Sequence, residues 1–174
     1  KRPTFQVEFD KVTADYQEGD TVSVRGVARS YAGVPVQGAK VAVSVVRRPS
    51  RWCWWIWTYG SEVTMLTDTI QTDDEGAFVV NIPMVMPEKW DGKAPRYYSF
   101  DVEADVTNLA GESHHGQMAL PLSDKPTAFN LVIPDKMRRD KVADIQFSLV
   151  NNAGENVDAE VNFRVDGGEN HAVR

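Results

Sequence analysis

The stretch Tyr31–Val41, YAGVPVQGAKV, returns in shortened form as Asn152–Val161, NAGENVDAEV. The two turn glycines, Gly33 and Gly154, stand 121 residues apart (154 minus 33). Each copy places Ala-Gly at a tight turn, follows it with a short connection and opens a strand on Ala-x-Val. We therefore predict that both copies form the same strand-turn-strand corner. A period this long indicates tandem domains and not a solenoid.

Alternation of apolar and polar residues accounts for nearly every other apolar stretch and predicts strands with one buried face. The predicted strands lie around Phe5–Phe9, Val22–Ala28, Val41–Val45, Phe78–Ile82, Phe100–Val106 and Met118–Leu122. Polar turns with Asp, Asn and Gly separate them. This spacing predicts an all-β fold, an immunoglobulin/fibronectin-like antiparallel β-sandwich of about seven strands. Residues 1–122 are its predicted extent, and residues 135–145 are interpreted as a solvated loop, not a helix.

A second domain is predicted after a polar linker at residues 123–126, whose proline stops the preceding strand from continuing. Alternation restarts at Phe129–Ile133, Ile145–Leu149 and Val161–Val165. Three strands cannot close two sheets. We therefore expect residues 127–174 to be the first strands of a second, incomplete sandwich in a piece of a longer protein, with Leu122–Pro126 as a candidate hinge.

Composition narrows the classes of function. A net charge of -6 and a pI near 5.1 argue against nucleic acid and anionic membrane surfaces as partners. Cys53 is the only cysteine, so the chain forms no internal disulfide and offers no set of four zinc ligands. No signal peptide or apolar run of about 20 residues is present. We find no combination of nucleophile, base and metal ligand, and expect no cofactor and no enzymatic activity.

The most unusual composition is the Trp-rich segment, residues 51–59. If it is extended, its aromatic residues divide between both faces, so a single core cannot bury them all. Four exposed indoles would leave about 600–1,000 Å² of apolar surface in water, more than the roughly 300–600 Å² of the largest apolar patch on an ordinary monomer. We predict a protein-contact surface, covered by a neighbouring domain, with Arg47, Arg48 and Arg51 stacked on the indoles. Alternatives are contact with a protease or stacking on sugars. The candidate residues are Arg51, Trp52, Trp54, Trp55, Trp57 and Tyr59.

Other polar groups are interpreted as structural. Asp73–Glu75 could contribute to a calcium site, but three acids before a glycine are more often a hairpin. Asp101–Asp105 alternates acidic with apolar residues, which indicates the wet face of a strand. His114 and His115 are placed in a turn beside Gly116, without a third metal ligand nearby. Cys53 has no base next to it in sequence, and aromatic surroundings raise the pKa of a thiol.

Four motifs in order resemble the macroglobulin-like domains of bacterial alpha-2-macroglobulins. They are the entry strand Lys1–Val7, the turn Tyr16–Asp20, the corner Tyr31–Val41 and the segment Thr72–Phe78, interpreted as a hairpin. Residues 127–165 look like the beginning of the next such domain. The resemblance implies a structural segment of a large envelope protein, in the bacterial periplasm or on the cell surface, that traps proteases.

The sequence departs from this family at its reactive site. The family's thioester requires Cys-x-Glu-Gln, whereas Cys53 is followed by Trp-Trp-Ile. A bait region, the protease-sensitive linker that triggers closure, is not recognisable either. The resemblance therefore implies neighbouring domains of the same parent chain as direct partners, and proteases only through the whole protein. The alternative is an adhesion or carbohydrate-binding module that uses the Trp-rich segment.

Overall fold

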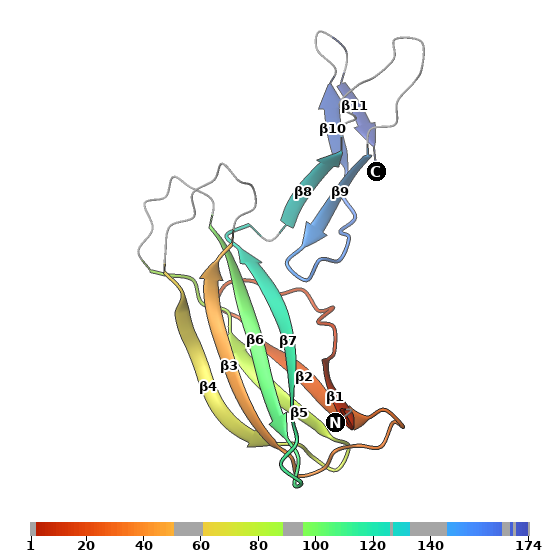
Figure 1. Ribbon diagram of the computed structural model, residues 1–174. Helices are drawn as coiled ribbons and strands as arrows, with labels where there is room; N and C mark the ends of the chain where they lie inside the picture. The colour runs from red at the N-terminus through yellow and green to blue at the C-terminus, as the bar shows by residue number, and fades with distance from the viewer. Residues whose placement is uncertain are drawn as a thin grey trace.

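The chain folds into strands and their connections (Figure 1). The computed structural model describes residues 3–50, 61–88, 96–125, 127–132, 146–164, 168 and 170–173. Every regular element in these ranges is a strand, and the paired strands are antiparallel, as predicted. A search of the same ranges for a helix long and apolar enough to cross a membrane finds none.

Strands β1 to β7 build two sheets that face each other. One sheet has the order β1-β2-β5 and the other β4-β3-β6-β7. The strands are β1 (Phe5–Phe9), β2 (Thr21–Ser30), β3 (Lys40–Pro49), β4 (Val63–Gln71), β5 (Ala77–Pro83), β6 (Tyr97–Thr107) and β7 (Ser113–Ser123). Inward side chains from both sheets meet in one hydrophobic core. This unit, called the first sandwich below, is the immunoglobulin/fibronectin-like fold that the sequence predicts.

Alternation produces this core directly. In β6, Val102 and Ala104 are fully buried, whereas Glu103 and Asp105 are exposed and Asp101 is half-buried. The interpretation of these acids as the wet face of a strand is therefore confirmed. Each fully buried valine or larger apolar side chain contributes about 1.5–3 kcal/mol to stability relative to the exposed side chain. A strand with its apolar side chains on one face therefore turns that face to the core.

Strand β4, Val63–Gln71, is not among the strands that sequence alternation predicts. It lies at the edge of its sheet, paired only with β3 among the described strands. Its side chains are exposed or half-buried, and the pairing with β3 contains a β-bulge between Val45 and Val46. An edge strand with a bulge has no continuous buried face, so it carries no period-two signal.

The repeated corner forms as predicted, in both copies. Ser30 N donates to Val34 O at 2.8 Å, and Asn151 N donates to Glu155 O at 3.0 Å. The glycine three residues into each turn has a positive φ, 83° at Gly33 and 79° at Gly154, a conformation that costs glycine little. Just beyond the turns, isolated bridges join Arg29 to Pro35 and Val150 to Asn156. The two bridges have the same spacing of 121 residues as the glycines.

The segment Thr72–Phe78 is not the hairpin that we predict from the sequence. Its turn exists, closed by Asp73 N donating to Ala77 O at 2.8 Å. However, β4 before it and β5 after it belong to different sheets. The turn is therefore a corner that carries the chain from one sheet to the other, because an Asp-x-x-Gly turn sets the local reversal but not the strand that follows.

Residues beyond the linker repeat the pairings of the first sandwich. Strand β8 (Thr127–Val132) pairs with β9 (Gln146–Asn151) as β1 pairs with β2, and β10 (Val161–Arg164) pairs with β11 (Asn170–Val173) as β3 pairs with β4. The sequence predicts the first three of these strands, and β11 is a fourth. We call β8–β11 the second repeat. The rejected helix at 135–145 lies outside the described residues.

Candidate functional site at the joint of the repeats

The predicted protein-contact surface lies outside the described residues. Its members are Arg51, Trp52, Trp54, Trp55, Trp57 and Tyr59. Cys53 lies there too. The residue before this Trp-rich segment, Ser50, is held at the end of β3, where its N–H donates to Tyr97 O at 2.8 Å. The structure thus fixes where the segment begins, at the end of the first sandwich from which the second repeat follows (Figure 1).

Two of the three arginines expected to stack on indoles have other contacts. Arg47 is buried, its Nη1 donates to Val85 O at 2.6 Å, and its guanidinium lies over the Tyr98 ring at 5.5 Å. Its Nε has no hydrogen-bond partner among the described residues. Arg48 lies on the surface, 3.4 Å from Asp101. Arg47 therefore makes a cation–π contact with a tyrosine, whereas the indoles on which we predict it to stack lie outside the described residues.

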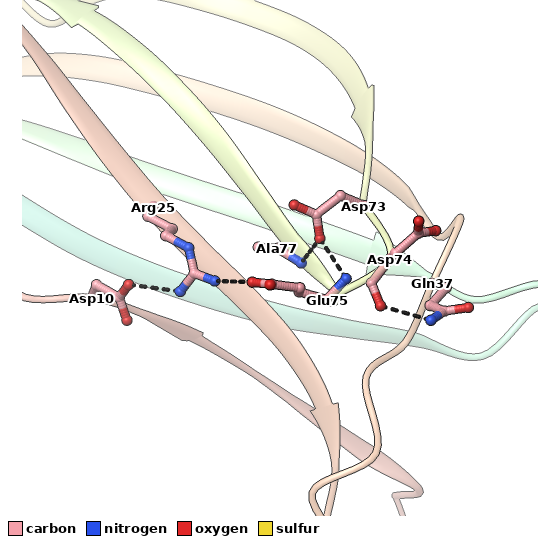
Figure 2. Close-up of polar contacts among 7 residues, drawn as sticks. All are labelled: Asp10, Arg25, Gln37, Asp73, Asp74, Glu75 and Ala77. Atoms are coloured by element: carbon pink, nitrogen blue, oxygen red, sulfur yellow. Dashed lines mark hydrogen bonds and ion pairs between the residues drawn. The ribbon is translucent and has the colours of Figure 1, made fainter.

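The acidic turn at Asp73–Glu75 uses its oxygens within the fold (Figure 2). Oδ1 of Asp73 accepts hydrogen bonds from Glu75 N and Ala77 N, both at 2.8 Å. Glu75 is 3.4 Å from Arg25, which also pairs with Asp10 at 3.0 Å. Within the described residues, no group of three or more His, Cys, Asp or Glu could hold a metal ion. These contacts give the acids a structural role in a turn held by an Asx-type cap, but this turn is the corner between the two sheets and not the predicted hairpin.

His114 and His115 lie within strand β7, and their predicted position in a turn is wrong. Gly116 pairs with Ala104 across the strands and continues β7 instead of ending it. Nε2 of His114 is 2.6 Å from Glu112, and its ring packs edge-on against Phe5 at 4.4 Å between centroids. The contact with Phe5 attaches β1 to β7, the first strand of the first sandwich to its last.

The contact between the two repeats, which we call the joint, consists of Tyr16, Pro121, Ser123 and Asn152. Tyr16 precedes β2, and Asn152 lies in the turn after β9, at the place that Tyr31 has in the first copy. Nδ2 of Asn152 donates to Tyr16 O at 2.8 Å, and the Tyr16 hydroxyl lies 3.0 Å from Asn152 O and 2.8 Å from Pro121 O. Ser123 N donates to Asn152 Oδ1 at 3.3 Å.

The joint is almost dry. Tyr16 is 4% exposed and Asn152 is 7% exposed. Burial, and secondarily the nearby charge of Asp15, raise the pKa of the Tyr16 phenol well above its ordinary range. The hydroxyl therefore remains a donor to backbone carbonyls over the whole physiological pH range. At the rim of the joint, Lys11 Nζ lies 2.6 Å from Glu155.

A cavity of about 240 Å³ lies beside the joint. Its walls come from both repeats and from the residue before the Trp-rich segment: Ser50, Tyr97, Tyr98, Pro121, Leu122, Ser123, Val150, Asn151, Asn152 and Gly154. The predicted hinge at Leu122–Pro126 requires a correction at its first two residues. Leu122 is buried in the core within β7, and Ser123 is bonded to Asn152, so neither is a free link.

Sequence reasoning does not identify Tyr16 and Asn152 as a contact. Tyrosine and asparagine are ordinary in turns, and the two residues are separated by 136 positions. The available signal is the repeat itself, because Asn152 lies in the second copy of the recurring turn. Chemically, the joint positions two β-sheet units relative to each other.

Comparison with known proteins gives matches among solved structures. No family model and no curated protein sequence matches the chain. The native alpha-2-macroglobulin of E. coli matches with a TM-score of 0.58 and 12% identity, over 98% of this chain and 13% of that one. The trypsin-activated form of the E. coli protein gives 0.59 and 13%, over 98% and 14%. Salmonella alpha-2-macroglobulin reacted with methylamine gives 0.60 and 12%, over 99% and 14%.

These matches include both repeats, since they cover nearly the whole chain, and the chain spans about one seventh of the length of the proteins it matches. At 12–13% identity the likeness is one of fold. The fold of this chain is therefore similar to that of a segment of the bacterial alpha-2-macroglobulins, as the motifs of its sequence predict.

Proposed function

We propose that this chain is a pair of adjacent, non-catalytic structural modules of a larger bacterial alpha-2-macroglobulin-like protein. Residues 1–122 would be the first macroglobulin-like sandwich, 123–126 the linker and 127–174 the first strands of the next. The observation that carries the proposal is the buried joint between the end of the first sandwich and the second copy of the repeated corner. Such a contact suits modules that must keep a fixed relative orientation, since a buried amide with all its partners satisfied is specific in geometry.

The role of the whole protein, in this proposal, is inhibition of endopeptidases by trapping. A trap needs walls that hold their shape while a larger rearrangement encloses the protease. The contacts of Asp73, Glu75 and Asn152 support this structural role, because each of these side chains is bonded to a neighbour within the chain. Direct partners would be neighbouring modules, and the location would be the periplasm or the cell surface.

Trapping can be tested with the full parent polypeptide and trypsin. A protease enclosed by a cage should lose activity on a large substrate such as casein, yet still cleave a small chromogenic peptide, because only the small substrate can diffuse through the gaps. The 174-residue chain alone should change neither rate. Equal loss on both substrates would indicate inhibition at the active site, and inhibition by the isolated chain would refute a purely structural role.

The Trp-rich segment is proposed as a contact surface for another module of the same parent chain. The position of Ser50, the residue just before this segment, supports the proposal, because Ser50 lines the cavity between the repeats. The double substitution Trp54→Ala/Trp55→Ala should leave the circular dichroism and the cooperative unfolding of the isolated chain unchanged while weakening its association with neighbouring modules. Loss of the fold would place the indoles in the core. Quenching of tryptophan fluorescence by a polysaccharide would instead support the adhesion or carbohydrate-binding alternative.

A further inference from the structure

The turn of the second repeat shows what the same turn does when a module precedes it. Its tip, Asn152–Glu155, contacts the end of the first sandwich. Asn152 is buried, Ala153 packs against the core of the first sandwich, and Glu155 pairs with Lys11. This contact follows from topology, because the first residue of β8 pairs with the residue that begins the turn, Thr127 with Asn151. The tip therefore always lies beside the point where the chain enters the module.

The first sandwich has the same arrangement at its own entry. Phe5, the first residue of β1, pairs with Ser30, which begins the equivalent turn. The N-terminal end of the described chain and the Ser30–Val34 turn accordingly lie at the same end of the sandwich (Figure 1). The chain would therefore pass from any preceding module into β1 directly beside this turn. In the same way, it passes from the first sandwich into β8 beside the turn of the second repeat.

The side chains of this first tip have the character of an uncovered contact. Tyr31 stands where Asn152 stands in the second copy, and it is 63% exposed. Val34 stands at the place of Glu155 and is 61% exposed. Ala32, the counterpart of the packed Ala153, is exposed as well. Burying the apolar surface of this tyrosine, alanine and valine would be favourable. Tyrosine is a frequent anchor in interfaces because it buries a large area with few rotatable bonds.

Resting on the proposed function, we infer that the Tyr31–Val34 tip is a docking surface for the C-terminal end of a preceding β-sandwich module in the parent polypeptide. Tyr31 and Val34 would enter an apolar depression at that end, as Asn152 of the second tip binds Tyr16 and Ser123 and Ala153 packs against the core of the first sandwich. The contact would be more apolar than the described joint, because the tip offers a phenol and a valine where the second copy offers an amide and a carboxylate. Consecutive modules would then be linked by one recurring contact.

Hydroxyl-radical footprinting of Tyr31 tests this inference in two polypeptides, the 174-residue chain and the full parent polypeptide. Tyr31 should be oxidised severalfold more slowly in the full polypeptide. Val79, which is 52% exposed on the outer face of β5, is the internal control and should react at the same rate in both. Equal oxidation of Tyr31 in both would overturn the inference.

A pair of variants gives an independent result. The double substitution Tyr31→Asp/Val34→Asp should leave the Tm of the 174-residue chain unchanged, since both side chains are exposed, and should lower the unfolding temperature of the preceding module in the full polypeptide. Val79→Asp should change neither. If a sandwich precedes this chain and remains indifferent to the double variant, the docking surface is wrong while the structural role stands. If no sandwich precedes it, the proposed function fails as well.

Discussion

Glu112 shows how one half-buried residue can join the first and the last strand of the first sandwich. Its carboxylate accepts hydrogen bonds from Thr4 N at 2.8 Å and Thr4 Oγ1 at 2.7 Å, and Oε1 lies 2.6 Å from His114 Nε2. Thr4 leads into β1, and His114 lies in β7. The contact from His114, followed by those from Thr4, lowers the pKa of Glu112 from about 4.5 to about 2.

This pKa predicts a direction of acid sensitivity. A carboxylate with a lowered folded-state pKa adds stability that is complete above its unfolded value near 4.5 and is lost as the pH falls through about 2. The substitution Glu112→Gln should reduce the loss of stability between these pH values, and the titration should be visible in the carboxyl NMR signal of Glu112. Glu103→Gln, on the exposed face of β6, is the control. An ordinary titration of Glu112 near pH 4.5 would contradict the hydrogen-bonded arrangement.

At the scale of elements, one five-residue turn serves four different connections. It begins at Ser30, Asp73, Asn108 and Asn151, and each has a hydrogen bond from the first N–H to the fifth carbonyl and a glycine of positive φ at the fourth position. The side-chain oxygen of the first residue also accepts from the fifth N–H. The same turn closes the β6–β7 hairpin and the corner between sheets, so the turn alone does not decide the topology.

The surroundings of each turn predict unequal tolerance of substitution. At Gly111 a Cβ would meet open space, so Gly111→Ala should cost only the strain of a positive φ, about 1 kcal/mol. At Gly76 a Cβ would overlap the carbonyl oxygen of Ala28 in β2, so Gly76→Ala should cost clearly more. Urea unfolding of the two variants measures both values. Equal losses would mean that the Gly76 turn can move away from β2.

At the scale of the whole molecule, the joint determines whether the second repeat depends on the first. Asn152→Ala leaves the carbonyl of Tyr16 and the N–H of Ser123 without a partner and should weaken the docking by about 1–3 kcal/mol. Hydrogen exchange should accelerate in residues 146–157, whereas strands β3 and β6 should keep their protection. Lys11→Ala, which removes an exposed ion pair, should cost about 1 kcal/mol or less and is the matched control.

The opposite outcome is also informative. Unchanged exchange in the second repeat of Asn152→Ala would mean that apolar contacts such as that of Ala153 hold the repeats together without the hydrogen bonds. Loss of protection throughout both repeats would mean that they unfold as one cooperative unit, which would contradict the separate modules proposed for residues 1–122 and 127–174.

The sequence by itself determined the strands with one buried face and the repeated corner. Val102 and Ala104 alternate with acidic residues because apolar side chains face the core and charged side chains face water. The turns at Gly33 and Gly154 need only a local hydrogen bond and a positive φ. These are properties of neighbouring residues, so a local pattern is sufficient to predict them.

Only the tertiary structure decided which surfaces meet. It assigned β4 and β5 to different sheets, placed His114 in β7 against Phe5 and brought Asn152 onto Tyr16. The contact of Asn152 joins residues 136 positions apart, and the same Ala-Gly turn forms in the exposed first tip and in the docked second tip. The difference arises from the partner that covers the tip, which is a property of the assembled chain and not of the residues beside it.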